Sequence, residues 1–329
     1  MKRRSFVAAA IAAPAILSFN PLRAQSRQKV TYAYLLDPAY ETVVWAIKNG
    51  KVKSDLIDVE ATGLLIPQLI QATSAKQYDV IMTAVIGVPA ALARGLQLSI
   101  LSAALENSPA GEGGGVWVKK DSPIKSGADL KGKTLGSYGL RATGYMFVRE
   151  AITKEYGLNM ALEGGDVRQV EIQAPNLPAA LSTGQVDAAA LIHSQAWRAQ
   201  QAGDFVDVVQ SGKILDRLYG PLVSAVNVSY PEKLSERPTA FEEFNRMLKE
   251  SVQYALANRA EVFGAAAKQA NIDSAYFEWW FDKASTVPAV FGAQQSKAVQ
   301  TAWKIAIDLG MIKKAPEVNE VTWSKTLKS

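Results

Sequence analysis

A thirteen-residue segment of this chain occurs twice, and this internal repeat constrains the fold more than any other feature. Residues 67–79 align without gaps with residues 175–187 and share Pro, Leu, Ala, Ser, Gln and Asp, six of the thirteen positions. Two unrelated alanine-rich helices would not normally share Pro, Gln and Asp in register. A duplicated structural unit therefore explains the match better than chance.

Each copy of the repeat predicts the same order of elements. A helix ends near the shared Gln, a short apolar strand follows at residues 80–83 or 188–192, and a loop leads into another helix. Upstream, residues 29–34 and 133–138 have the pattern of matching first strands. Short apolar strands that alternate with helices indicate parallel βαβ units. The sequence therefore predicts two α/β lobes of one plan, each doubly wound and Rossmann-like.

The lobe boundaries are expected where glycine and proline interrupt the pattern. Gly111–Gly115 is the strongest linker signal, and Tyr219–Pro221 precedes a strand-like segment through which the chain can return. Residues 239–267 have helical periodicity, and we expect this C-terminal region to pack on the first lobe. The predicted double hinge joins a first lobe to an inserted second lobe and leaves a cleft between them; their ranges are 25–115 with 223–329, and 116–222.

The first 24 residues have the order of a secretory signal, with Lys2-Arg3-Arg4, an apolar run and then Ala24. The apolar run is shorter than the ~20 residues of a spanning helix, and Pro14 interrupts it, which favours a signal over an anchor. The Arg pair resembles a twin-arginine motif, although Lys2 stands where Ser or Thr is usual, so both the Sec and the twin-arginine routes stay open. We expect a periplasmic protein beginning at Gln25.

Composition excludes several classes of function. Loss of residues 1–24 removes four of 36 basic residues and none of 31 acidic ones, which leaves a net charge of +1 and no argument for nucleic-acid binding. With one histidine and no cysteine, the usual metal sets are missing and no disulfide can form. No Gly-x-Ser-x-Gly elbow occurs, and the glycine-rich run Gly111–Gly115 lacks the following Lys-Ser/Thr of a phosphate-binding loop. We therefore expect no catalytic residue, no metal and no cofactor, and a chain that acts as a monomer.

Ligands of open α/β sheets bind beyond the carboxyl ends of the strands. Applied to both lobes, this rule predicts a ligand site built from Leu36, Asp37, Tyr40, Gln68, Thr83, Val85, Arg141, Thr143, Asn176, His193 and Ser194.

Several of these residues also have a purely structural interpretation. Gln68 and Asn176 hold equivalent repeat positions and either contact ligand or cap a helix. Arg141 either binds an anion near a helix start or stays solvated or paired with Asp37. His193 either binds ligand or serves as a hydrogen-bonded structural residue.

Aromatic residues offer a second set of candidates. Tyr40, Trp117 and Trp197 could wall an apolar ligand, with core packing the better interpretation of Trp117. A C-terminal group is expected to anchor helices, with a place at the cleft rim as its alternative: Phe277, Trp279, Trp280 and Phe281.

Three ordered motifs resemble the nitrate, sulfonate and taurine class of periplasmic binding proteins, which includes thiamine-precursor receptors. They are the Asp-Leu-Lys-Gly-Lys run within residues 122–135, the repeat copy at 177–188, and residues 306–312. The resemblance covers nearly all of the chain after the signal and implies a type II periplasmic fold that closes on one ligand. The sequence departs from the family at Gly139-Leu140 and at Ile192–Gln195, so the resemblance does not carry a substrate across.

The resemblance implies the solute-binding component of an ABC importer, with a permease and its ATPase as partners. Leu140 in place of a small hydroxyl residue favours an organic anion, such as a sulfonate, a taurine-like compound or a carboxylate, over nitrate. An enzyme related to pyrimidine synthases, a pyrimidine-precursor binding protein and a sensor domain are the alternatives; the lack of cysteine, the export signal and the lack of a DNA-binding or membrane segment disfavour the enzyme and the sensor.

Overall fold

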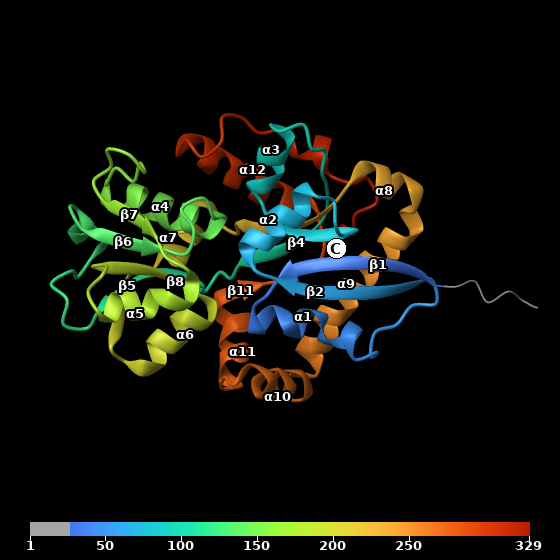
Figure 1. Ribbon diagram of the computed structural model, residues 1–329, viewed down its shortest axis with the longest axis horizontal. Helices are drawn as coiled ribbons and strands as arrows, with labels where there is room; N and C mark the ends of the chain where they lie inside the picture. Colours follow the sequence, from blue (N-terminus) through green and yellow to red (C-terminus); the bar gives the residue numbers. More distant parts are fainter. Residues whose placement is uncertain (1–26) are drawn as a thin grey trace, which may run out of the picture.

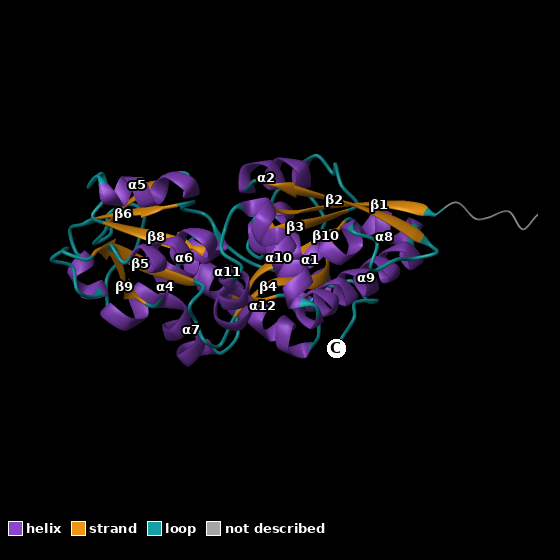
Figure 2. Cartoon of the chain, turned by 90° about the horizontal axis from the view of Figure 1, so that it is seen from below, coloured by secondary structure: helices purple, strands orange, loops and turns teal. Residues whose placement is uncertain are grey.

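The computed structural model describes residues 27–329, in which two β-sheets are each covered by helices on both faces (Figure 1). The predicted export signal and its cleavage site after Ala24 lie outside the described residues. Figure 2 shows the two sheets beside each other along the long axis of the molecule. This arrangement is the two-lobed α/β fold that the repeat predicted.

The first sheet has six strands in the order β11-β4-β10-β3-β1-β2. Their bounds are β1 Gln28–Leu35, β2 Ile57–Leu64, β3 Val80–Ala84, β4 Ser99–Asn107, β10 Val223–Ser229 and β11 Ser285–Thr286. The second sheet has five strands in the order β7-β6-β8-β5-β9. Their bounds are β5 Gly114–Lys119, β6 Thr134–Ser137, β7 Arg168–Glu171, β8 Ala188–Ile192 and β9 Phe205–Val209.

The first lobe consists of the first sheet and eight helices of the described chain. These are α1 Pro38–Lys48, α2 Ile66–Ser74, α3 Gly87–Leu92, α8 Pro231–Glu236, α9 Pro238–Ala257, α10 Arg259–Ala270, α11 Ala275–Trp279 and α12 Ala293–Asp308. Strand β1 has buried side chains on both faces of the sheet. Tyr32 and Tyr34 belong to the apolar cluster that includes α1 and α9, and Ala33 belongs to the cluster that includes α2 and α12. The helix expected over residues 239–267 is two helices, because the backbone turns at Asn258.

The second lobe consists of the second sheet and four helices, α4 Thr143–Tyr156, α5 Leu177–Ser182, α6 His193–Ala202 and α7 Ser211–Tyr219. Short 3₁₀ turns lie at Gly127–Leu130 and Ala174–Asn176, and Val318–Val321 forms another near the C-terminus. A π-helical turn, Trp280–Ala284, follows α11 in the first lobe. Such turns are rare and often lie at functional sites.

The two sheets have equivalent strand orders, but neither is wholly parallel. In the first sheet β2-β1-β3 is parallel and β10 runs antiparallel to β3; in the second, β7-β6-β8 is parallel and β5 runs antiparallel to β8. The βαβ units predicted from the repeat are parallel, whereas β5 and β10, whose direction the repeat did not predict, are antiparallel to their neighbours. Each is the strand that the chain enters after crossing from the other lobe, so it comes into its sheet from the opposite end.

The glycine-rich crossing between β4 and β5 is tightly packed. A Cβ on Gly113 would lie 2.3 Å from the carbonyl oxygen of Ala284, and one on Gly115 would lie 2.3 Å from a carboxylate oxygen of Asp207. These contacts exclude any larger residue at both positions. The glycines that suggested a linker in the sequence thus serve close backbone packing at the boundary between the lobes.

The aspartate shared by the two repeat copies has the same structural role in each lobe. Asp79 Oδ2 accepts a hydrogen bond from the backbone N–H of Thr31 at 3.0 Å, and Asp187 Oδ2 accepts one from that of Thr134 at 2.8 Å. Each carboxylate fixes the start of the parallel strand that follows it against the lobe's first strand. The shared aspartate therefore makes an equivalent structural hydrogen bond in each lobe, just before the amino-terminal end of β3 or β8.

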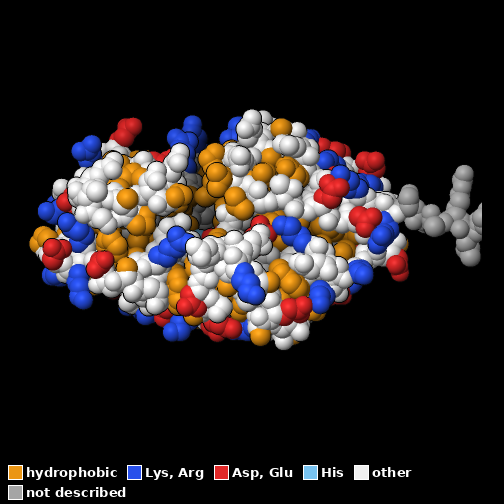
Figure 3. Space-filling view, turned by 60° about the horizontal axis from the view of Figure 1, so that its bottom comes forward, with side chains coloured by type: hydrophobic (Ala, Val, Ile, Leu, Met, Phe, Trp, Pro, Cys, Tyr) orange, Lys and Arg blue, Asp and Glu red, His pale blue; other side chains and the backbone are white. Residues whose placement is uncertain are grey.

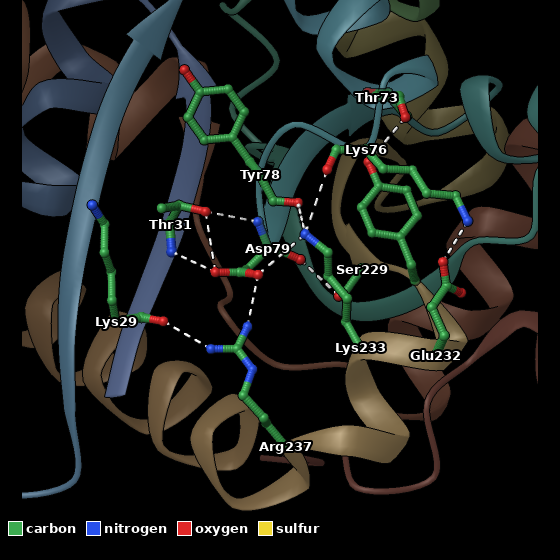
Figure 4. Close-up of polar contacts among 11 residues, drawn as sticks. Lys29, Thr31, Thr73, Lys76, Tyr78, Asp79, Ser229, Glu232, Lys233 and Arg237 are labelled. Carbon is green, nitrogen blue, oxygen red and sulfur yellow. Dashed lines mark hydrogen bonds and ion pairs between the residues drawn. The ribbon is translucent and has the colours of Figure 1, made fainter. Parts of the chain in front are cut away.

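In the first lobe this carboxylate has gained two cationic partners (Figure 4). Asp79 Oδ1 lies 2.7 Å from Arg237 Nη2 and 3.2 Å from Lys233 Nζ. Burial raises the pKa of Asp79, but the Thr31 hydrogen bond and the charges of Lys233 and Arg237 outweigh it and leave the pKa below its usual value. The two ion pairs of Asp79 connect the segment from α8 to α9 with β1 and β3.

We predict that Asp79→Ala destabilises the protein by about 2–4 kcal/mol, because it leaves two partly buried cations without their partner. The matched variant Asp187→Ala, on an exposed carboxylate without a cation, is expected to cost about 1 kcal/mol. Urea unfolding of both variants measures the difference. Equal losses would show that the two cations add nothing to the shared hydrogen bond.

Asp207 supplies a pH dependence at the boundary between the lobes. Its carboxylate lies against Gly115 and accepts a hydrogen bond from Val209 N at 3.1 Å, and burial raises its pKa to about 8. The folded protein therefore holds a proton that the unfolded chain releases near pH 4. The stability that Asp207 contributes is greatest in acid and is lost as the pH rises through 8.

We predict that wild-type stability falls relative to Asp207→Asn between pH 5 and pH 8, by up to about 1.4 kcal/mol per pH unit. Urea unfolding at pH 5, 6.5 and 8 measures the difference between the two proteins. A difference that stays constant over this range would show that Asp207 is ionised throughout.

Candidate functional site

The carboxyl ends of the parallel strands in both lobes point to the region between the lobes. The end of β8 pairs with Gly114 at the crossing, and the end of β3 pairs with the start of β10 at the other crossing. Figure 3 shows the surface hollowed between the two halves, with hydrophobic side chains on both sides. The region in which ligands of such sheets bind is therefore shared by the two lobes.

The first lobe presents apolar side chains at these strand ends. Leu36 follows β1 and is 51% exposed, and Leu65 follows β2 and is 54% exposed. Ile66 and Ile70 on α2 are also exposed. Large apolar side chains left in water at one edge of a sheet indicate a surface that something else covers.

Asp37 lies next to Leu36 and is held by two contacts. Its Oδ1 accepts a hydrogen bond from Ala39 N at 2.9 Å, which caps α1, and lies 3.3 Å from the hydroxyl of Tyr276. Leu36 and Asp37 also line a hollow of about 240 Å³ that α10 closes on the other side. Asp37 thus combines its capping role with a place beside an open hollow.

Other predicted site residues of the first lobe have packing or capping contacts. Tyr40 is 1% exposed, stacks on Tyr34 and shares a 3.1 Å hydrogen bond with the hydroxyl of Tyr32. Gln68 Oε1 accepts from Leu65 N at 2.9 Å, the capping alternative that the sequence left open. The two remaining residues are Thr83, which is half-buried beside Gly87, and Val85, which is fully buried.

In the second lobe, the loop after β6 presents hydrogen-bond donors. Arg141 is exposed and forms no ion pair within residues 27–329. Thr143 and Gly144 begin α4, and no described acceptor bonds to their backbone N–H groups; the buried Oγ1 of Thr143 also lacks a partner there. Glu171 Oε2 accepts from Leu140 N at 2.9 Å and fixes the loop. The end of this loop is an electropositive helix start.

His193 starts α6 directly at the end of β8, without the intervening loop that the repeat predicted. Its φ is +49°, and its Nδ1 accepts a 2.7 Å hydrogen bond from Nε1 of Trp280 in the first lobe. Ser194 follows it and is half-buried, whereas Asn176 is exposed near the start of α5. Of these three residues, His193 has a side-chain contact that joins the two lobes.

Aromatic side chains from α6 and α11 meet beside His193, where Figures 1 and 2 both place these helices next to each other. Trp197 lies 5.5 Å from Trp279 and 6.3 Å from Tyr276, measured between ring centroids. Trp279 Nε1 in turn donates to Glu112 in the crossing at 2.8 Å. The sequence left the orientation of Trp197 open, and the structure places it at this contact between the lobes.

The C-terminal aromatic group expected to anchor helices divides into two. Phe277 and Phe281 stack on Phe263 of α10 and so anchor helices, while Trp279 and Trp280 donate hydrogen bonds toward the crossing and the second lobe. Trp117 is buried in the core, as the sequence suggested. Sequence reasoning missed Tyr276 and Glu171, because neither lies in a strand-end loop that their local patterns identify.

Two further properties concern the described residues. Within residues 27–329, no group of three or more His, Asp or Glu side chains is placed to hold a metal ion. Over the same range no helix combines the length and hydrophobicity that a membrane crossing requires.

Solved structures share this fold at low sequence identity. The aliphatic sulphonate binding protein SsuA from Escherichia coli is 16% identical with a TM-score of 0.71, and the match covers 91% of this chain and 98% of that one. The alkanesulfonate-binding protein SsuA from Xanthomonas axonopodis pv. citri, solved with MOPS, is 19% identical with a TM-score of 0.71, and the match covers 90% of this chain and 98% of that one. The protein AF1704 from Archaeoglobus fulgidus is 22% identical with a TM-score of 0.70, and the match covers 86% of this chain and 98% of that one. These matches confirm the periplasmic-binding-protein fold.

The sequence also matches a family model. No curated protein gives a significant match. The family model described as NMT1/THI5 like matches residues 67–262, which is more than half of the chain and spans parts of both lobes. The chain therefore belongs to the NMT1/THI5-like family, in agreement with the class that its motifs indicated.

Proposed function

We propose that this protein is the extracytoplasmic solute-binding component of an ABC importer and captures a small organic anion between its lobes. One observation carries the proposal. Donors without a described acceptor at the start of α4, with Arg141 beside them, follow the carboxyl end of β6, and the exposed apolar residues of the first lobe follow the carboxyl ends of β1 and β2. These strands run parallel to β8 and β3, whose carboxyl ends pair with residues at the crossings between the lobes.

The second lobe supports the anionic part of the ligand. Within residues 27–329, the backbone N–H groups of Thr143 and Gly144 have no acceptor and the guanidinium of Arg141 has no carboxylate partner. An oxyanion there gains charge-assisted hydrogen bonds and the favourable end of a helix dipole. Glu171, at the end of the neighbouring strand β7, already accepts a hydrogen bond from Leu140 N in that loop.

The first lobe supports an apolar body on the ligand. Leu36, Leu65, Ile66 and Ile70 expose between 39% and 58% of their surface at the strand ends. Nitrate could cover none of this surface, whereas an organic sulfonate or carboxylate could bury part of it, at about 25 cal/mol per Å². Two proteins of similar structure, an aliphatic sulphonate binding protein and an alkanesulfonate-binding protein bound to MOPS, agree with this ligand class.

The proposal includes export and an ABC transporter. Residues 1–24 carry the pattern of an export signal, and a permease with its ATPase would receive the solute. No observation on the site favours the enzymatic alternative. A thermal-shift screen over sulfonates, carboxylates, nitrate and pyrimidines tests the ligand class, and turnover of a binder by the purified protein would contradict the proposal.

We predict that Arg141→Ala weakens binding of the best anionic ligand about tenfold or more, because a hydrogen bond to a charged group contributes about 1.5–3 kcal/mol. The melting temperature without ligand should not change, since Arg141 has no described partner to lose. Titration calorimetry measures the affinity. Arg94→Ala, on another exposed arginine without an ion pair in residues 27–329, is the control. Equal affinities for both variants would remove Arg141 from the site.

We also predict that ligand makes the particle more compact, because the two lobes must close to bury a solute held between them. Small-angle scattering with and without saturating ligand measures the radius of gyration. At a ligand concentration close to the wild-type Kd, Arg141→Ala should stay nearer the ligand-free curve than the wild type does, in line with its weaker binding. Unchanged wild-type scattering at saturation would contradict closure between the lobes.

A further inference from the structure

The only histidine of the chain, His193, is the first residue of α6 and has an unusual backbone conformation. His193 has φ +49°, in the left-handed region that histidine adopts more readily than most residues, and α6 follows β8 without a loop. The residue before it, Ile192, offers no side-chain cap. An imidazole, not a capping side chain, therefore stands at the carboxyl end of β8, where β8 reaches the crossing between the lobes.

The contact with Trp280 determines which imidazole nitrogen carries the proton. An indole N–H can only donate, and Trp280 Nε1 lies 2.7 Å from His193 Nδ1. Nδ1 must therefore be the acceptor, which requires a neutral ring with its hydrogen on Nε2. The ring centroids of His193 and Trp280 lie 6.0 Å apart and the ring planes make an angle of 30°. The two rings therefore approach most closely at these two nitrogens.

The donor in this contact cannot easily move. Trp280 is 1% exposed, lies in the π-helical turn and packs edge-on against Phe281 at 4.8 Å. Phe281 in turn stacks on Phe263 of α10 at 5.4 Å. The first lobe thus holds the indole N–H rigidly and imposes the tautomer on a residue of the second lobe.

The other ring nitrogen is free to act. His193 Nε2 makes no hydrogen bond to any described residue, and it is not among the enclosed polar atoms that lack a partner, so solvent reaches it. We propose that Trp280 fixes His193 as a neutral Nε2–H donor, and that this N–H binds an acceptor group of the solute.

This inference rests on the proposed function for the identity of the site, but the tautomer does not. The chemical consequence is selectivity. A neutral donor selects a carboxylate, sulfonate or carbonyl oxygen and rejects an ammonium group, which can only donate, while Arg141 and the start of α4 compensate the negative charge. His193 then acts as a specificity-determining residue, and Trp280 acts through it as a positioning residue.

The tautomer is tested on ligand-free protein by long-range ¹H–¹⁵N correlation spectroscopy at pH 7.5, since one histidine gives one set of ring signals. We expect a protonated Nε2 and an unprotonated Nδ1. Trp280→Phe should shift these signals toward a tautomer mixture, whereas Trp279→Phe, which removes an indole bonded to Glu112, should leave them unchanged. A proton on Nδ1, or no difference between the variants, would overturn the inference.

The donor role is tested by calorimetry with benzenesulfonate and benzoate as probes. His193→Leu should weaken binding about tenfold, and His193→Gln, whose amide can donate from a similar position, should stay within about threefold of wild type. Equal binding by the leucine variant would overturn the donor role. If neither probe binds wild-type protein, the anion assignment of the proposed function fails, while the ligand-free spectrum still decides the tautomer.

Discussion

The structure depends on one packed crossing between the lobes. Along it, Ser108 N donates to Ala284 O at 3.3 Å and Glu112 N donates to Lys283 O at 3.0 Å, so the chain that leaves β4 is bonded to the π-helical turn. Gly113 lies against the same turn with no room for a side chain. This contact sets where β5 enters the second sheet and so turns the carboxyl ends of both sheets toward each other.

Much of the fold could be predicted because the sequence contains the same structural unit twice, so each copy supports the interpretation of the other. The Asp of each copy marks the start of the strand that follows, and the hydrogen bonds of Asp79 and Asp187 to the first strand of each lobe explain why both kept it. The antiparallel direction of β5 and β10 could not be predicted from this signal. Their sequences are apolar like those of the parallel strands, and direction depends on which end of the sheet the crossing chain reaches.

The site was less predictable, because a strand-end rule selects loops without saying where each side chain points. It selected Leu36 and Arg141, whose side chains are exposed at the strand ends, and Asp37, which is half-buried and caps α1. It also selected Tyr40, whose place in the first turn of α1 faces the core, and Gln68, whose amide caps α2. Of the two residues it missed, Tyr276 comes from a C-terminal segment whose return to the crossing leaves no local pattern, and Glu171 ends the strand β7, which the repeat does not include.

The proposed site combines two kinds of polar group, and their difference has a physical reason. A guanidinium such as that of Arg141 attracts anions from a distance but fixes orientation weakly when it is exposed and unpaired. A neutral N–H such as that of His193 attracts little at long range, yet its partner must align with it at close range. The first lobe restricts this donor through Trp280, whereas no described contact restricts Arg141. In the proposed site, capture and orientation of a solute therefore fall to different residues, and orientation depends on the contact between His193 and Trp280 of the other lobe.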